Sequence, residues 1–422
     1  MADPWAALPP RGAAPAAAHA SSLLTPPFVL TWCATFAFFM SYYILLPTIP
    51  LYAVALGGTE AQVGLVMGLL TASSTFARPC VAPAIDRRRR KPFIAVGAGI
   101  FVISSLLYLL ATSIPRLLLL RIFHGTGMGI FMTAATTLVA DVAPLPRRGE
   151  VMGTYGLAIN LAMALAPAAG MALINSASFA ALFFVAAGVA LVALALGVAV
   201  PEAPRSPRLG GAPGGPSAAP ETEGLHRGRI ISRPAVFPSI IVLALTITYG
   251  AVLTFLPLWG RANRLENPGT FFTLYAAALL AVRTQAGKLS DRFGLGAVIV
   301  PGLGIISAAM LLLAAADRPW KVLGAGVVFG IGMGAVQPSL AALVTDRAPE
   351  VERARAFATY YGAFELGIAV GSIGLGAFLE ATSFPAMWVA AGAIVALGAA
   401  MFLAGAGGGM GRAPSRPVHG VT

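Results

Sequence analysis

The stretch GLVMGLLTASSTFARPCVAPAIDRRRRK, residues 64–91, is an apolar run, long enough to cross a membrane, that ends in a cluster of charged residues. A second stretch, FFTLYAAALLAVRTQAGKLSDRFG, occupies residues 271–294 and shows the same order of features. Arg283 stands 205 positions after Arg78 (283 − 78 = 205). The same offset relates the charged residues that follow, because Asp86 and Arg87 recur as Asp291 and Arg292. The recurrence indicates that the chain consists of two related halves.

The same offset relates another pair of segments. HGTGMGIFMTAATTLVADVAPLPRRGEVMGTYGLAIN, residues 124–160, aligns with FGIGMGAVQPSLAALVTDRAPEVERARAFATYYGAFE, residues 329–365. The residues that recur are Gly125, Gly127, Met128, Gly129, Asp141, Pro144, Arg148 and Tyr155, found again as Gly330, Gly332, Met333, Gly334, Asp346, Pro349, Arg353 and Tyr360. Two homologous halves of apolar helices are typical of secondary transporters, in which the substrate site lies between the repeats.

The composition excludes a soluble protein. Of the 422 residues, 58% are hydrophobic and 10% are charged, and the mean hydropathy is +0.82, as expected for an integral membrane protein. The net charge of +12 comes from short basic groups between apolar runs. Such groups are typical of cytoplasmic loops facing anionic lipid, so we predict membrane lipids and no nucleic acid as partners.

The sequence offers no pattern for a metal, a cofactor or catalysis. Cys33 and Cys80 both fall in apolar runs, and the four histidines have no metal-ligand spacing. The longest polar interval, residues 201–235, is too short for a catalytic domain. We therefore predict no metal, no cofactor and no enzyme activity.

Apolar runs of about 20 residues predict an all-α membrane protein with twelve transmembrane helices in two pseudo-symmetric six-helix bundles. The predicted spans are 28–52, 62–85, 93–112, 115–140, 151–174, 179–200, 236–259, 269–290, 297–316, 321–345, 354–379 and 384–405. The bundles are thus residues 28–200 and 236–405. We expect residues 1–27 to be a disordered tail, residues 201–235 to be a Pro-rich cytoplasmic linker and residues 406–422 to be a C-terminal tail.

The basic residues predict the orientation. With both termini in the cytoplasm, the tails and cytoplasmic loops hold about 20 of the 28 Lys and Arg residues. The opposite loops hold only Arg116, Arg261, Arg264, Arg318 and Lys321. We therefore expect a multi-pass protein of the plasma (inner) membrane.

Away from the ends of the predicted spans, four charged residues are expected at bilayer depth: Arg78, Arg121, Arg283 and Glu365. A charge at the centre of a bilayer costs about 2.5–3.5 kcal/mol on insertion scales, so each needs a partner or a water-filled cavity. Glu365 lies about 11 residues into the span 354–379, or about 16 Å from its start at 1.5 Å per helical residue. It is the only acidic residue among these four. Its candidate roles are proton coupling or substrate contact, and a static ion pair bracing two helices is the alternative.

The duplication suggests partners for these charges. If the span 62–85 packs on 354–379 and the span 269–290 packs on 151–174, two related pairs follow, Arg78 with Glu365 and Arg283 with Asn160. One pair is then charged, and its twin is not. The alternative is that both arginines extend to the cytoplasmic interface.

Arg121 begins the run RIFHGTGMG, whose glycines allow a helix or a substrate to approach the backbone closely. His124 lies one turn along the same face and is either a further coupling residue or a hydrogen-bonded structural one. Near the kink-forming prolines of the first and seventh spans, aromatic residues are candidates to line a cavity or to sit at the membrane interface. The candidate cavity residues are Tyr42, Tyr43, Tyr249 and, from the tenth span, Gln337.

The duplicated Asp-Arg loops, the glycine run at Arg121, the segment ADVAPLPRRGEVMG and the twelve-span layout resemble the major facilitator superfamily. The loop copy GKLSDRFG is similar to the family pattern GxLaDRxGRR. The resemblance is to the twelve-helix drug:proton antiporter and sugar-efflux group, and the segments Arg78-Pro79 and YGAFELGIAVGS are similar to a branch that includes metallophore exporters. It implies a proton-coupling role for Arg121. It also implies gating loops formed by Asp86, Arg87, Arg90, Asp291 and Arg292, with Asp86 latching onto the start of the span 354–379.

From these observations we predict a secondary active transporter that exports a small organic solute in exchange for protons by alternating access, and that functions as a monomer. A proton-coupled uptake symporter of the same fold is one alternative. A membrane receptor that transports nothing is another, although the buried charges and the duplicated loops argue against it.

Overall fold

The computed structural model describes residues 25–87, 89–144, 147–201 and 231–407, and it is helical throughout with no strand in these ranges. The helices of the first half are α1 (Pro26–Leu45), α2 (Thr48–Ala55), α3 (Glu60–Arg87), α4 (Lys91–Leu107), η1 (Tyr108–Leu110), α5 (Ile114–Val142), α6 (Arg148–Ser176) and α7 (Phe179–Ala199). Those of the second half are α8 (Arg233–Ala262), α9 (Gly269–Phe293), α10 (Gly296–Ala314), α11 (Pro319–Arg347), η3 (Glu350–Glu352), α12 (Arg353–Ala381) and α13 (Phe384–Gly407). The predicted tails and linker lie for the most part outside the described residues.

The predicted fold class is confirmed. Within the described ranges, eleven helical segments are long and apolar enough to cross a membrane, and a shorter apolar segment, Gly269–Arg283, lies in α9. Helices are favoured in a bilayer because they satisfy every backbone N–H and C=O group internally. The first predicted span, 28–52, is divided into α1 and α2 at Pro47, which has no backbone N–H to donate.

Successive helices alternate in direction, so the molecule has two distinct ends. At one end α1 begins, α3 ends at Arg87, α4 begins at Lys91 and α13 ends; we call this the basic end. At the other end α2 finishes and α3 begins at Glu60; we call this the Glu60 end. Both ends of the described chain, Pro26 and Gly407, therefore lie at the basic end.

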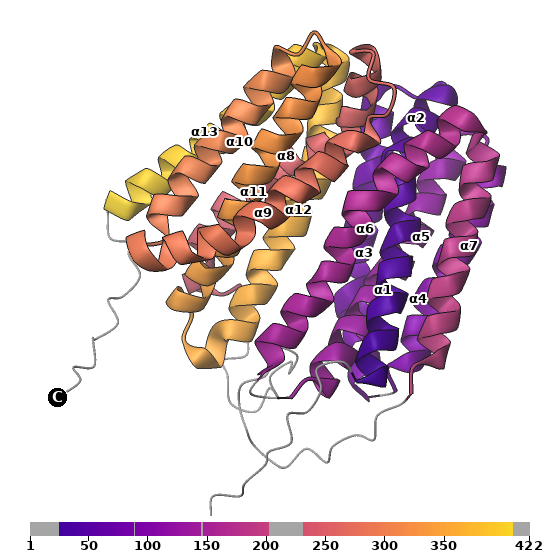
Figure 1. Cartoon of the computed structure of the whole chain (residues 1–422), viewed down its shortest axis with the longest axis horizontal. Helices are drawn as coiled ribbons and strands as arrows, with labels where there is room; N and C mark the ends of the chain where they lie inside the picture. Colours follow the sequence, from indigo (N-terminus) through magenta and orange to yellow (C-terminus); the bar gives the residue numbers. More distant parts are fainter. Residues whose placement is uncertain (1–24, 88, 145–146, 202–230, 408–422) are drawn as a thin grey trace, which may run out of the picture.

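The two largest interfaces between the halves are those of α3 with α12 and of α6 with α9. In Figure 1, α6 and α9 approach each other near the top of the view, at the end that carries α2, and diverge towards the lower, basic end. Near the Glu60 end both interfaces depend on a glycine. A Cβ on Gly64 would clash with the carbonyl of Ser372, and a Cβ on Gly269 would clash with the carbonyl of Pro167.

These two glycine contacts are related by the duplication, since 269 − 64 and 372 − 167 are both 205. The next contacts towards the basic end are related in the same way. A Cβ on Gly68 would lie 3.1 Å from the carbonyl oxygen of Ala369, and the Thr273 hydroxyl donates to the carbonyl of Ala164 at 2.6 Å. The two interfaces between the halves thus match at successive levels.

Candidate functional site

The structure brings Arg78 and Glu365 together where the two halves meet. Nη1 of Arg78, on α3, lies 2.5 Å from Oε1 of Glu365, on α12. The hydroxyl of Thr75 donates to the other carboxylate oxygen at 2.6 Å. The side chains of Arg78 and Glu365 are 32% and 15% exposed, so neither is sealed in the protein interior. A single carboxylate is thus held by two side chains of the opposite half.

The local sequence of α3 explains how Thr75 and Arg78 converge on one carboxylate. Residues three apart lie on the same face of a helix, so both side chains point towards α12. Pro79 follows immediately and cannot donate to the carbonyl of Thr75, which loosens the helix at this level. Sequence reasoning missed Thr75, because a hydroxyl in an apolar helix shows no role until its partner on another helix is known.

The twin positions are not joined in the same way. Arg283 is exposed, Asn160 is half-buried, and no hydrogen bond or ion pair links them among the described residues. Arg283 instead lies within electrostatic reach of the Tyr361 hydroxyl on α12. Figure 1 shows α6 and α9 diverging towards the basic end, whereas α3 and α12 are in contact through Glu365.

Arg121 is the centre of a second polar cluster, inside the first half. Its Nε donates to the carbonyl of Val66 at 2.9 Å, and Nη1 donates to the hydroxyl of Tyr108 at 3.2 Å. That hydroxyl also lies 2.9 Å from Nδ1 of His124. Arg121 is 2% exposed, and Tyr108 and His124 are fully buried. None of the ion pairs found among the described residues involves Arg121.

The second half contains no counterpart of this cluster. The twins of Arg121, His124 and Tyr108 are Gly326, Phe329 and Leu313. A Cβ on Gly326 would lie 2.8 Å from the ring of Phe271, which therefore fills the space that a long side chain would need. The polar chemistry of this site belongs to the first half alone. Sequence reasoning missed Tyr108, which lies outside the glycine run.

We expect Tyr108→Phe to destabilise the protein by about 1–3 kcal/mol, because it leaves buried groups of Arg121 and His124 without a partner. The control is Tyr52→Phe, since the Tyr52 hydroxyl is half-buried and donates only to backbone carbonyls. Thermal unfolding in detergent measures both effects. Equal losses in the two variants would show that the cluster has no special stabilising role.

The aromatic candidates Tyr42, Tyr43 and Tyr249 are each 9% exposed and lie near the middle of the spans Pro26–Ala55 and Arg233–Ala262. The rings of Tyr42 and Tyr43 are 5.0 Å apart, and Tyr43 is within electrostatic reach of Tyr249 in the other half. Tyr249 also stacks on Tyr275, at 6.1 Å. The three predicted tyrosines therefore lie close together across the junction of the halves.

Gln337, the remaining cavity candidate, lies on α11. It is half-buried, and its backbone carbonyl is 3.5 Å from the hydroxyl of Tyr360. Among the described residues, no hydrogen bond joins Gln337 to Tyr42, Tyr43 or Tyr249.

The two Asp-Arg loops differ in their contacts. In the first, Nε of Arg90 lies 3.2 Å from Oδ2 of Asp141, which ties the loop to the end of α5. Arg87 is exposed, and the side chain of Asp86 lies outside what the structure describes, so its latching role remains a prediction. In the second loop Asp291 and Arg292 are exposed, and the Arg292 guanidinium lies 5.1 Å from the centre of the Phe293 ring.

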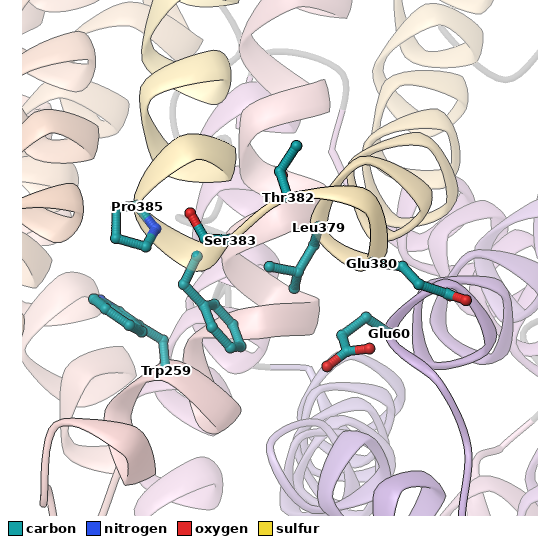
Figure 2. A pocket seen from close by; sticks show the side chains of 8 residues that line it. Glu60, Trp259, Leu379, Glu380, Thr382, Ser383 and Pro385 are labelled. Carbon is teal, nitrogen blue, oxygen red and sulfur yellow. The ribbon is translucent and has the colours of Figure 1, made fainter.

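At the Glu60 end, contacts between the halves close the molecule. Oε2 of Glu380 accepts a hydrogen bond from the backbone N–H of Ala61 at 3.0 Å, and Arg261 donates to Oδ1 of Asn175 at 2.6 Å. A recess of about 350 Å³ lies beside these contacts. Figure 2 shows Glu60 and Glu380 on one side of it and Trp259 on the other. These closing contacts could not be found from sequence, because they join loops and helix ends far apart in the chain.

Groups of three or more His, Cys, Asp or Glu side chains that could hold a metal ion do not occur among the described residues. The polar side chains that meet at the junction of the halves, Thr75, Arg78 and Glu365, form an ion pair and a hydrogen bond.

Comparison with known proteins agrees with this geometry. The chain is 23% identical to the staphylopine export protein of Staphylococcus aureus, over 87% of this chain and 93% of the relative. It is 26% identical to the multidrug resistance protein MdtG of Citrobacter koseri, over 84% of this chain and 88% of that relative. Among solved structures, a POT family transporter in complex with 5-aminolevulinic acid has a TM-score of 0.74 at 13% identity, covering 90% of this chain and 96% of its own. The nucleoside transporter NupG has a TM-score of 0.71 at 12% identity, and the match covers 90% of this chain and 99% of NupG.

The family profile described as Major Facilitator Superfamily matches residues 31–268 and 266–417, nearly the whole chain. The two halves, the helical fold and the relatives named above all agree with that match. The chain is therefore a multi-pass membrane protein of the major facilitator superfamily, whose members are transporters and not enzymes.

Proposed function

We propose that this transporter exports a small organic solute in exchange for protons by alternating access, with Glu365 as the proton-coupling acid. The observation that carries the proposal is the contact of Glu365 with Arg78 and Thr75 across the junction of the halves. Export is supported by two relatives, the staphylopine export protein and the multidrug resistance protein MdtG.

The chemistry follows from the contacts of the carboxylate. An ionised Glu365 is attracted by the guanidinium of Arg78, whereas a protonated one keeps only hydrogen bonds. Proton binding therefore weakens the link between α3 and α12, and proton release restores it. Because the two helices belong to different halves, the protonation state of Glu365 biases the movement of one half against the other.

The remaining candidate residues take roles consistent with their positions. Arg121 and His124 link α5 to α3 and η1 through Val66 and Tyr108, and we assign them to the coupling machinery. The tyrosines at the centre supply aromatic surface for a solute. The loops with Asp86, Arg87, Arg90, Asp291 and Arg292 lie at the basic end, where the halves must meet when that end closes.

We place the basic end in the cytoplasm of an inner-membrane protein, because basic residues concentrate in cytoplasmic loops. Both termini are then cytoplasmic, and the described state is closed at the extracytoplasmic Glu60 end. One chain contains both halves of the pathway, so a monomer suffices. Anionic membrane lipids are expected to contact the basic loops.

The test is proton movement in proteoliposomes that contain the purified protein and a pH-sensitive dye, challenged with cationic drugs, sugars and metal-chelating metabolites. We expect one of these compounds to move in the direction opposite to protons, and an imposed pH gradient to drive its accumulation. Movement of solute and protons in the same direction would instead identify an uptake symporter. Binding of a compound with no flux in either direction would identify a receptor.

A further inference from the structure

Arg283 is an arginine in a membrane span that lacks the anion its twin possesses. Arg78 has the carboxylate of Glu365 at 2.5 Å, whereas the residue that matches Glu365 in the first half is the uncharged Asn160. Among the described residues Arg283 has no ion pair or hydrogen bond. An arginine that lies at the end of the apolar segment Gly269–Arg283 and has no counter-charge is expected to attract an anion.

We infer that the transported solute is an organic anion, and that its carboxylate or an equivalent anionic group binds between Arg283 and Asn160, in the place that the Glu365 carboxylate takes beside Arg78. The inference rests on the proposed function and adds the substrate class to it. It assigns to α6 and α9 a binding site that is split between the two halves of the molecule.

The register of the two interfaces supports this placement. The contacts of Gly64 with Ser372 and of Gly68 with Ala369 have twins in the contacts of Gly269 with Pro167 and of Thr273 with Ala164. The next level on the α3 side is the contact of Arg78 with Glu365. Continued in the same register, the α6 and α9 interface therefore brings Arg283 to Asn160 once the basic end closes.

The residue types suit an anion. A guanidinium presents parallel N–H donors that match a carboxylate in two-point contact, and the Asn160 amide adds an N–H donor from the opposite half. Tyr361, whose hydroxyl is within electrostatic reach of Arg283 and whose side chain is half exposed, offers one more donor. Arg121 adds a further positive charge deeper in the first half, also without an ion pair among the residues described.

The split site also explains how the solute drives its own transport. In the described state α6 and α9 are in contact near the Glu60 end, through Thr273 and Ala164, and diverge towards the basic end (Figure 1). An anion bound by both Arg283 and Asn160 draws the two helices together at the basic end. Solute binding then favours closure of that end, while Glu365 on the other interface responds to protons.

The first arm of the test needs no ligand. In Asn160→Glu the chain supplies the missing carboxylate itself, so α6 should close on α9 at the basic end. Spin labels on those helices are expected to show at least a tenfold rise in the closed population, and Asn160→Gln, which adds no charge, should not change it. Closure in neither variant would overturn the placement of the site.

The second arm tests the substrate class by thermal stabilisation of the detergent-purified protein, with 3-phenylpropionate, its neutral amide and phenethylammonium as probes of similar size. We expect the carboxylate to bind at least tenfold more tightly than the other two, and Arg283→Gln and Asn160→Glu to remove this preference. Arg116→Gln is the matched control, because Arg116 lies at the Glu60 end and binds only Thr112. No preference for the carboxylate in the wild type would overturn the inference.

An anionic lipid headgroup offers the same chemistry as a soluble anion, so the probes are compared in nanodiscs of phosphatidylcholine with and without phosphatidylglycerol. If phosphatidylglycerol alone stabilises the protein through Arg283, the bound anion is a lipid and the inference is wrong. Failure of the proposed function is a separate result. If the proteoliposomes show no proton coupling, the proposed function is wrong, but carboxylate binding at Arg283 is still expected.

Discussion

Replacing Glu365 with glutamine is expected to abolish proton movement coupled to solute exchange while the protein still folds. The glutamine keeps the size of the side chain and the ability to accept from Thr75, but it can neither bind a proton nor form an ion pair with Arg78. In proteoliposomes we expect at least a tenfold loss of solute-dependent proton movement. Exchange of solute across the membrane should continue, because the halves can still move.

The control for this experiment is Glu150→Gln. Glu150 is exposed at the basic end and pairs only with Arg147, at 3.0 Å within one helical turn. Loss of that pair should leave proton movement unchanged. If Glu365→Gln retains full proton coupling, Glu365 is a structural brace and coupling must depend on the cluster of Arg121 and His124.

We expect Gly64→Ala to shift the protein away from the state that is closed at the Glu60 end. The new Cβ would clash with the backbone carbonyl of Ser372 in the other half, and a backbone atom cannot rotate away as a side chain can. Overpacking of this kind costs about 1–3 kcal/mol, and each 1.4 kcal/mol changes a population ratio about tenfold. Gly269→Ala, which meets Pro167, should act in the same direction.

Distances between spin labels at the Glu60 ends of α3 and α12 measure this shift. Gly374→Ala is the control, since Gly374 lies on α12 and a Cβ there meets no atom within 4 Å. We expect the control to keep the distances of the wild type. Unchanged distances in Gly64→Ala would mean that the interface relaxes around an added methyl group, and that the close approach at Gly64 does not select this conformation.

Helix α3 connects the features on which these experiments depend. Its Val66 carbonyl and Met67 sulfur accept hydrogen bonds from Arg121, and its Thr75 and Arg78 bind Glu365. Gly64 on the same helix closes the Glu60 end. A movement of α3 relative to α12 therefore alters the junction of the halves at both levels, while Arg121 keeps α3 attached to its own half.

Sequence by itself determined the membrane class, the helical spans and the duplication. These depend on hydropathy and on the recurrence of residues at one offset, which are properties of the chain that need no folding. The offset also placed Arg78 opposite Glu365, and in the structure the two side chains are in contact. That inference was possible because homologous halves pack in related ways.

Only the tertiary structure decided which partners complete each site. Thr75 and Tyr108 were missed because a hydroxyl in an apolar helix becomes informative only when its neighbours from other helices are known. The pair Arg283 and Asn160 also shows that sequence alone does not decide which side chains are in contact. Its two members match Arg78 and Glu365 in sequence, yet no ion pair or hydrogen bond joins them among the described residues, because Asn160 carries no charge and side-chain contacts depend on how the halves pack.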